Sequence, residues 1–270
     1  MNKIGINFEN VLAIKEELNI SVLEVLNKLK TLGITSLDVK YERLIGSDSY
    51  LKDIIVSGMS IDSVFSFCPL GEQNNVRKAV EIIDFLSEHK IKEFMIIAEF
   101  IDGGYSKEQM VNLKQNLRRI VKYAENFGVS VGIENVGHIN SPIKTAKETE
   151  DVLKAVKGLH LIFDGGNYLL ADEDPVNALN LAPYVQRLHL KDRSLKVLDG
   201  LVENTLKGIP SSVVALGEGD SSIKRTFEEI CKFYPSVPIV LEFPAIEKVI
   251  MSKIEKSAMY IHTELLVWQN

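Results

Sequence analysis

Four short apolar stretches decide the fold class of this chain: VSVGIEN (residues 129–135), GLHLIFDGGN (158–167), VQRLHLKD (185–192) and PIVLEFP (238–244). Each is a run of β-branched and aliphatic residues near glycine, asparagine or proline, which is typical of a buried parallel strand. Helical patterns separate the stretches along the chain, as they do in a parallel sheet with helical crossovers. We therefore expect all four strands to end at the same edge of one sheet.

The rest of the chain repeats this alternation of strand and helix. The first half contains four further units, beginning with KIGIN at residues 3–7 and an amphipathic helix predicted over residues 21–33. With 270 residues, of which 46% are hydrophobic, the chain is long enough to bury one large core. Eight alternating units predict an α/β fold, a closed (β/α)8 TIM barrel, as a single domain over residues 1–270.

Composition narrows the class of partner. The formal net charge is −6, so we expect no nucleic-acid partner and favour a small-molecule substrate. The two cysteines, Cys68 and Cys231, are too few for a disulfide framework or a thiolate zinc cluster. No apolar run approaches the roughly 18 residues of a membrane span, and MNKIGINFENV lacks the pattern of a signal peptide. We expect a cytoplasmic protein with no membrane partner.

Each of the four stretches carries a residue that can bind a metal near its end: Glu134, Asp164, His189 and Glu242. Strand ends converge above the axis of a barrel, so distance in the sequence does not keep these side chains apart. Three carboxylates and one imidazole suit Mn²⁺ or Mg²⁺, with Co²⁺ or Zn²⁺ as alternatives, and we favour manganese. Any one of the acidic residues alone is better explained as a helix cap or a lysine partner. Four together favour a metal site.

One connection is longer than the others. The segment RSLKVLDGLVENTLKGIPSSVVALGEGD (193–220) follows the stretch that contains His189. Long loops in compact domains usually have a functional or lid-like role, so we expect a loop that covers the site.

Five motifs resemble the xylose-isomerase-like TIM-barrel superfamily: GIENVG, IFDGGN, LHLKD, GEGD and VLEF, in this order. That superfamily contains sugar and sugar-phosphate isomerases and epimerases, dehydratases of inosose type, and the endonuclease IV type of DNA-repair enzyme. In the isomerase and epimerase branches the residues matching Glu134, Asp164, His189 and Glu242 bind one divalent metal. The resemblance thus implies a carbohydrate substrate and proton transfer through an enediolate, with Glu134 and Glu242 as the catalytic acid and base.

The chain departs from the family pattern at two asparagines. Asn167 stands where sugar epimerases have a histidine, and Asn140 stands where ketose epimerases have a further glutamate. Neither amide shuttles a proton near neutral pH, which leaves the exact reaction open. The chain also has only five histidines, too few in the required places for the three-metal cluster of endonuclease IV.

Weaker candidates for substrate binding are Asn167, Lys191, Arg193, His138 and Glu218. Lys191 and Arg193 follow the proposed metal-binding histidine, where their positive charges can contact a hydroxyl, carboxylate or phosphate of the substrate. The alternative interpretation is that they lie in a solvated loop and bind no substrate. For His138 the alternative is an ordinary surface histidine.

Two acidic residues and one loop are open to either a site role or a structural role. Glu42 and Glu99 either line the pocket or form salt bridges near helix starts. The backbone amides of residues 217–220 either bind phosphate or stabilise the loop, and the two acidic side chains there favour loop packing.

Three functions follow from this pattern. The preferred one is a divalent-metal sugar or sugar-phosphate isomerase or epimerase. The second is a metal-dependent dehydratase of the inosose or dehydroshikimate type, and the third is a sugar-binding barrel without catalysis. A homo-oligomer is possible for any of them.

Overall fold

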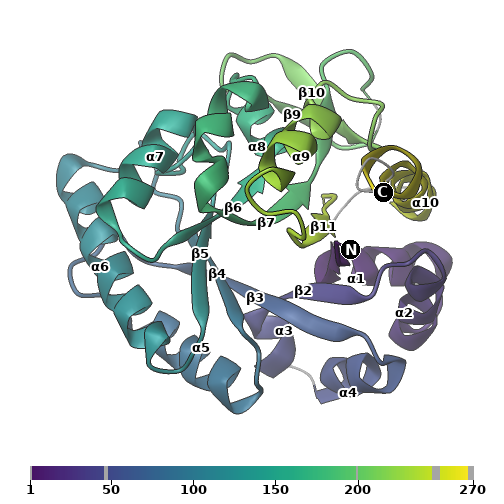
Figure 1. Cartoon of the computed structure of the whole chain (residues 1–270), viewed down its shortest axis with the longest axis horizontal. Coiled ribbons are helices and arrows are strands. Elements are labelled where there is room, and N and C mark those ends of the chain that lie inside the picture. Colours follow the sequence, from purple (N-terminus) through teal and green to yellow (C-terminus); the bar gives the residue numbers. More distant parts are fainter. Residues whose placement is uncertain (1, 46–47, 199, 245–249, 267–270) are drawn as a thin grey trace.

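Eight parallel strands close into a barrel in the order β1-β11-β7-β6-β5-β4-β3-β2, with helices around the outside (Figure 1). The structure is a computed structural model that describes residues 2–45, 48–198, 200–244 and 250–266. The barrel strands are β1 Ile4–Asn7, β2 Ser36–Lys40, β3 Ser60–Cys68, β4 Glu93–Ala98, β5 Ser130–Glu134, β6 His160–Asp164, β7 Val185–Leu190 and β11 Ile239–Leu241. The predicted (β/α)8 barrel is confirmed.

Three of the outer helices, α2, α6 and α7, begin at a capping box. Ser21, Ser106 and Thr145 each accept a hydrogen bond from the third residue of the following helix, whose own side chain bonds back to the cap. The helices are α1 Phe8–Leu18, α2 Val22–Thr31, α3 Tyr41–Ile45, α4 Asp48–Ser57, α5 Arg77–Glu88, α6 Lys107–Glu125, α7 Ala146–Ala155, α8 Gly165–Leu170, the 3-10 helix η1 Pro175–Tyr184, α9 Ile223–Cys231, α10 Ile250–Tyr260 and the π-helix η2 Ile261–Leu265.

The strands have a hydrophobic outer face and a mixed inner face. Most buried apolar residues form one cluster between strands and helices. A smaller cluster inside the barrel consists of Phe65, Met95, Ile97 and Ile162. Because side chains alternate along a strand, this cluster identifies the inward-facing register of β3, β4 and β6.

The long segment after β7 is not a loop, which corrects the expectation from its length. It forms a three-stranded antiparallel sheet from β8 Asp192–Ser194, β9 Val202–Asn204 and β10 Pro210–Val214, in the order β8-β10-β9. Backbone hydrogen bonds join Thr205 to Ile209 and Gly208 to Thr205, closing the hairpin between β9 and β10. The Leu206 amide also bonds the Leu170 carbonyl at 3.1 Å, which fastens the hairpin to the end of α8.

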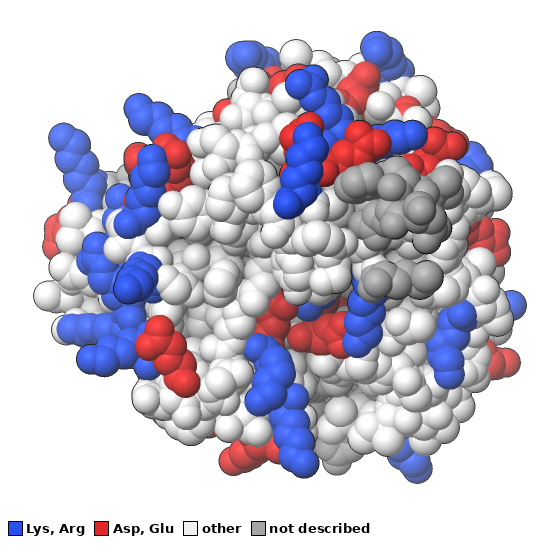
Figure 2. Space-filling model, viewed as in Figure 1, with Lys and Arg blue, Asp and Glu red and all other residues white. Residues whose placement is uncertain are grey.

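The charged surface is mixed in sign. On the face drawn in Figure 2, Lys and Arg side chains are interspersed with Asp and Glu. Within the described residues, the longest apolar helical segments fall short of what a bilayer crossing requires.

Candidate metal centre

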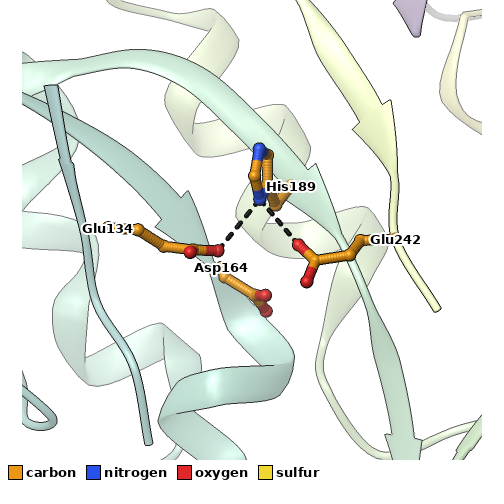
Figure 3. Close-up of side chains that lie close together, drawn as sticks. All are labelled: Glu134, Asp164, His189 and Glu242. Carbon is orange, nitrogen blue, oxygen red and sulfur yellow. Dashed lines mark hydrogen bonds and ion pairs between the residues drawn. The ribbon is translucent and has the colours of Figure 1, made fainter. Parts of the chain in front are cut away.

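Glu134, Asp164, His189 and Glu242 meet at the carboxyl ends of β5, β6, β7 and β11 (Figure 3). Each offers one ligand atom, and these four atoms all lie within 4.8 Å of one another. Glu134 and Asp164 are the last residues of their strands, and Glu242 directly follows β11. Parallel neighbours in a closed barrel bring these ends to one rim, as the sequence predicted.

His189 lies at the centre of the cluster, and both of its ring nitrogens face carboxylates. Its Nδ1 lies 2.9 Å from Glu134 Oε1 and 2.7 Å from Glu242 Oε2. Its Nε2 lies 3.2 Å from Asp38 Oδ2, on β2. A proton on Nε2 satisfies Asp38 and leaves the Nδ1 lone pair directed at the two glutamates, which is the tautomer that a metal ligand needs.

Asp38 belongs to a second layer of charge deeper in the barrel. Arg187 Nη1 donates to Asp38 Oδ1 at 3.2 Å, and the same guanidinium donates to both oxygens of Glu93 at 3.0 and 2.7 Å. All three side chains are buried. Arg187 therefore fixes Asp38, which in turn orients His189.

Lys191 lies with Glu134, Asp164 and Glu242 in the upper layer of charge, nearer the rim of the barrel. Its Nζ lies 2.8 Å from Asp164 Oδ2 and 2.9 Å from Glu242 Oε1. Gly166 makes room for it, because a Cβ at that position would lie 2.5 Å from the Lys191 carbonyl oxygen. The predicted substrate-binding lysine is thus an ion-pair partner of two of the four clustered residues.

The electrostatics of the cluster reflect crowded negative charge. Burial, reinforced by the charge of Glu242, raises the pKa of Glu134 to about 7. Burial also raises the pKa of Asp164. Burial opposes ionisation of Glu242 as well, but the nearby Lys191 ammonium keeps its pKa below the ordinary value. Burial lowers the pKa of His189, yet the surrounding carboxylates, Glu134 first, hold it well above the ordinary value.

Two carboxylate oxygens of the cluster lack a hydrogen bond of good geometry. Asp164 Oδ2 and Glu242 Oε2 are buried and make no hydrogen bond of good geometry, although each has a nitrogen nearby. A buried carboxylate oxygen normally has a donor or a cation. Three carboxylates and an imidazole are also a donor set that divalent metals accept. The residues present therefore fit a divalent cation.

Two asparagines fix the position of Asp164 through hydrogen bonds. Asn135 exchanges two hydrogen bonds with the Asp164 backbone, at 2.9 and 2.8 Å. Asn167 donates its backbone amide to Asp164 Oδ1 at 3.0 Å and its side-chain amide to the Asn135 carbonyl at 2.9 Å. The side-chain oxygen of Asn167 lies 3.4 Å from Lys191 Nζ. Its predicted contact with substrate stays a prediction.

The remaining predicted substrate-binding residues have protein partners. Arg193 lies in β8, where its guanidinium bonds Glu203 of β9 and Ser211 of β10. His138 stacks on Phe100 in the loop after β5. Glu218 pairs with Lys256 of α10 at 3.0 Å. The structure brings none of these three into the four-residue cluster, and their roles with substrate remain predictions.

The amides of the GEGD loop bind a side chain of the protein itself. Asp192, buried at the start of β8, accepts hydrogen bonds from the amides of Gly217, Gly219 and Ser221 at 2.9, 3.0 and 3.1 Å. Gly219 is required by this approach, since a Cβ there would lie 2.2 Å from Asp192 Oδ1. The structural interpretation of this loop is confirmed, and its phosphate-binding alternative is wrong for these amides.

Glu42 and Glu99 also have structural partners. Glu42 bonds Ser66 at 2.9 Å and Lys78 at 2.8 Å. Glu99 accepts the backbone amides of residues 70 and 71, which holds the loop after β3.

A family model described as the xylose isomerase-like TIM barrel matches residues 52–259. The chain belongs to this family. Among proteins with curated descriptions, none matches the sequence of this family member.

Solved structures with the same fold share little sequence with the chain. The probable 3-DHS dehydratase AsbF of Bacillus anthracis has a TM-score of 0.72 at 13% identity, covering 97% of this chain and 99% of that chain. L-ribulose 3-epimerase has a TM-score of 0.74 at 15% identity, covering 100% and 96%. The IOLI protein, described with a bound zinc atom, has a TM-score of 0.74 at 14% identity, covering 98% of each chain. At these identities the similarity establishes the fold alone.

Proposed function

We propose that this family member is a divalent-metal-dependent sugar or sugar-phosphate isomerase or epimerase. The observation that carries the proposal is the cluster itself: four ligand atoms within 4.8 Å of one another, two of whose carboxylates have an oxygen without a hydrogen bond. Glu134, Asp164, His189 and Glu242 would hold the metal. The donor set suits Mn²⁺, which we favour, and also Mg²⁺, Zn²⁺ or Co²⁺.

The bound metal would supply Lewis acidity to a carbonyl oxygen of the substrate, which acidifies the neighbouring C–H bond. Glu134 and Glu242 then have the proton-transfer roles. The two carboxylates approach the same nitrogen of His189, and their pKa values are shifted in opposite directions. A pair of carboxyl groups separated in this way can act as acid and base on one substrate.

Asp38 and Lys191 hold this arrangement in position. Asp38 keeps the Nε2 proton of His189, so that Nδ1 is free to act as a ligand. Lys191 fixes one oxygen each of Asp164 and Glu242. Neither side chain needs to exchange a proton with substrate for these functions.

Deuterium exchange tests the proposal, because uptake at a carbon next to a carbonyl reports proton abstraction whatever the product. The protein with added Mn²⁺ is incubated in D₂O with a panel of ketoses and ketose phosphates, and uptake is followed by NMR. We expect uptake that falls at least about 100-fold in Glu134→Gln and in Glu242→Gln. The matched control is Glu264→Gln, which removes a surface partner of Lys224 and is expected to change nothing.

Metal analysis of each variant separates loss of the metal from loss of the acid or base. Undiminished uptake in both glutamine variants would reject the assigned acid and base. A new ultraviolet absorbance from a conjugated product, in place of isomer formation, would instead identify the dehydratase chemistry.

A further inference from the structure

Three rings form a partly exposed aromatic surface at the carboxyl-end rim of the barrel. The centroids of Phe67 and Phe100 lie 5.7 Å apart, with the rings at 85°. Phe100 stacks on His138 at 4.6 Å and 14°. Phe67 and Phe100 are each 38% exposed, so the surface is open to a ligand.

The register of the barrel directs Phe67 toward its mouth. Phe67 pairs with Ile97 across β3 and β4, and Ile97 packs inside the barrel with Phe65 and Ile162. Phe67 shares this inward face, since side chains two residues apart on a strand point the same way. β3 is four strands from β7 in either direction around the barrel. Phe67 therefore lines the side of the mouth across from His189, and Phe100 and His138 continue the surface from the ends of β4 and β5.

Lys40 adds a positive charge to this aromatic surface. It ends β2 and pairs with Phe65, which gives it the same inward direction. Its Nζ lies 5.9 Å from the centre of the Phe67 ring. Within the described ranges, no carboxylate forms an ion pair with Lys40, whereas Lys191 on the opposite side is held by two.

We propose that Lys40, Phe67, Phe100 and His138 form a second subsite for an anionic group, phosphate or carboxylate, at the end of the substrate remote from the reacting carbonyl. The ammonium would donate charge-assisted hydrogen bonds to that anion. The rings would pack against the apolar face of the carbon skeleton and exclude water around it. The subsite rests on the proposed function, because that function makes the His189 side of the mouth the reacting end.

Two pairs of probes that differ only in the anion test this subsite. The first pair is D-ribulose 5-phosphate and D-ribulose, and the second is 3-dehydroshikimate and its methyl ester. Affinities are measured by calorimetry for the whole chain with added Mn²⁺. In at least one pair we expect the anionic probe to bind more tightly, and the pair that shows this identifies phosphate or carboxylate.

Variants then assign the effect to residues. In Lys40→Gln we expect the affinity for the preferred anionic probe to fall by about 10- to 100-fold. The affinity for the neutral probe should change less than about twofold. Phe67→Leu, which keeps apolar volume but loses the ring, is expected to weaken both members of the pair by a similar factor. Lys224→Gln removes the same charge from the surface of α9 and is expected to change neither.

The subsite is overturned if neither pair shows a preference for the anion, or if Lys40→Gln keeps that preference. Deuterium exchange without anion preference would remove the subsite and leave the proposed function standing. An anion preference that depends on Lys40, without deuterium exchange on any probe, would support the subsite and reject the proposed function.

Discussion

Two layers of charge inside the same barrel differ in how completely their carboxylates are satisfied. In the deeper layer, Arg187 and His189 donate to every carboxylate oxygen of Glu93 and Asp38. In the upper layer, Asp164 Oδ2 and Glu242 Oε2 have ion-pair contacts to Lys191 and His189 but no hydrogen bond of good geometry. The contrast supports the proposal that the deeper layer is structural and that the upper layer holds a cation.

Charge gives the same contrast. In the state that binds a metal, with His189 neutral and all three carboxylates of the upper layer ionised, these carboxylates and the Lys191 ammonium carry a net charge of −2, which one divalent cation would balance. His189 joins the two layers, since its Nε2 contacts Asp38 and its Nδ1 contacts the glutamates. Substitutions in the two layers should therefore respond differently to metal.

The largest effect on the free energy of unfolding is expected for a substitution of Arg187. Arg187→Met leaves Glu93 and Asp38 buried without their cation, so we expect a loss of about 3 to 5 kcal/mol in the free energy of unfolding. Urea denaturation measures it, and added Mn²⁺ should not reduce the loss, because Arg187 also fixes Asp38 and through it the ligand His189. Lys224→Met, which breaks an exposed pair, should cost no more than about 1 kcal/mol. A loss at Arg187 as small as this control would mean that the deeper layer does not support the barrel.

A smaller and metal-dependent effect is expected at Lys191. Lys191→Met should destabilise the metal-free protein by roughly 2 to 3 kcal/mol, because Asp164 and Glu242 lose their ammonium partner. Added Mn²⁺ should recover part of this loss by supplying positive charge to the same oxygens. The same urea titrations test it, and an equal loss with and without Mn²⁺ would erase the distinction between the layers.

The smallest effect on stability is expected at Asp38, the residue of the deeper layer that contacts His189. In Asp38→Asn, the side-chain amide can donate to His189 Nε2 and so shift the proton to Nδ1, the atom that faces the glutamates. We expect metal affinity to fall by about 10- to 100-fold, with little change in fold. Nitrogen-15 NMR of the histidine ring in the metal-free variant, at a pH above the raised pKa of His189, should show the changed tautomer. An unchanged tautomer together with unchanged affinity would rule out the orienting role.

Much of the upper layer could be predicted from the sequence. Glu134, Asp164, His189 and Glu242 each follow an apolar run, and the geometry of a barrel converts that pattern into proximity. The closed barrel followed from the same alternation.

The deeper layer could not be identified in this way, although it left a signal. In VQRLHLK the residues Arg187, His189 and Lys191 alternate with apolar neighbours, which is the pattern of a strand whose inner face is charged. The pattern does not reveal that Asp38 and Glu93, from β2 and β4, face Arg187. Such partners depend on strand order and register.

The segment after β7 was mispredicted for a related reason. Its strands are only three to five residues long and carry weak alternation, so a loop was the simpler prediction. The bond network that fixes it, from Asp192 to the amides of the GEGD loop, spans 25 to 29 residues of sequence. A local pattern contains no sign of such a contact.

Titration of the metal-free protein with Mn²⁺, followed by calorimetry and by thermal unfolding, tests the central claim most directly. We predict one metal ion bound per chain, with about 2.7 kcal/mol of added stability when free metal exceeds Kd a hundredfold. Asp164→Asn and His189→Gln should abolish this binding, while Glu264→Gln should bind like the unmodified chain. Metal binding that survives both cluster substitutions, or no binding by the unmodified chain, would contradict the account.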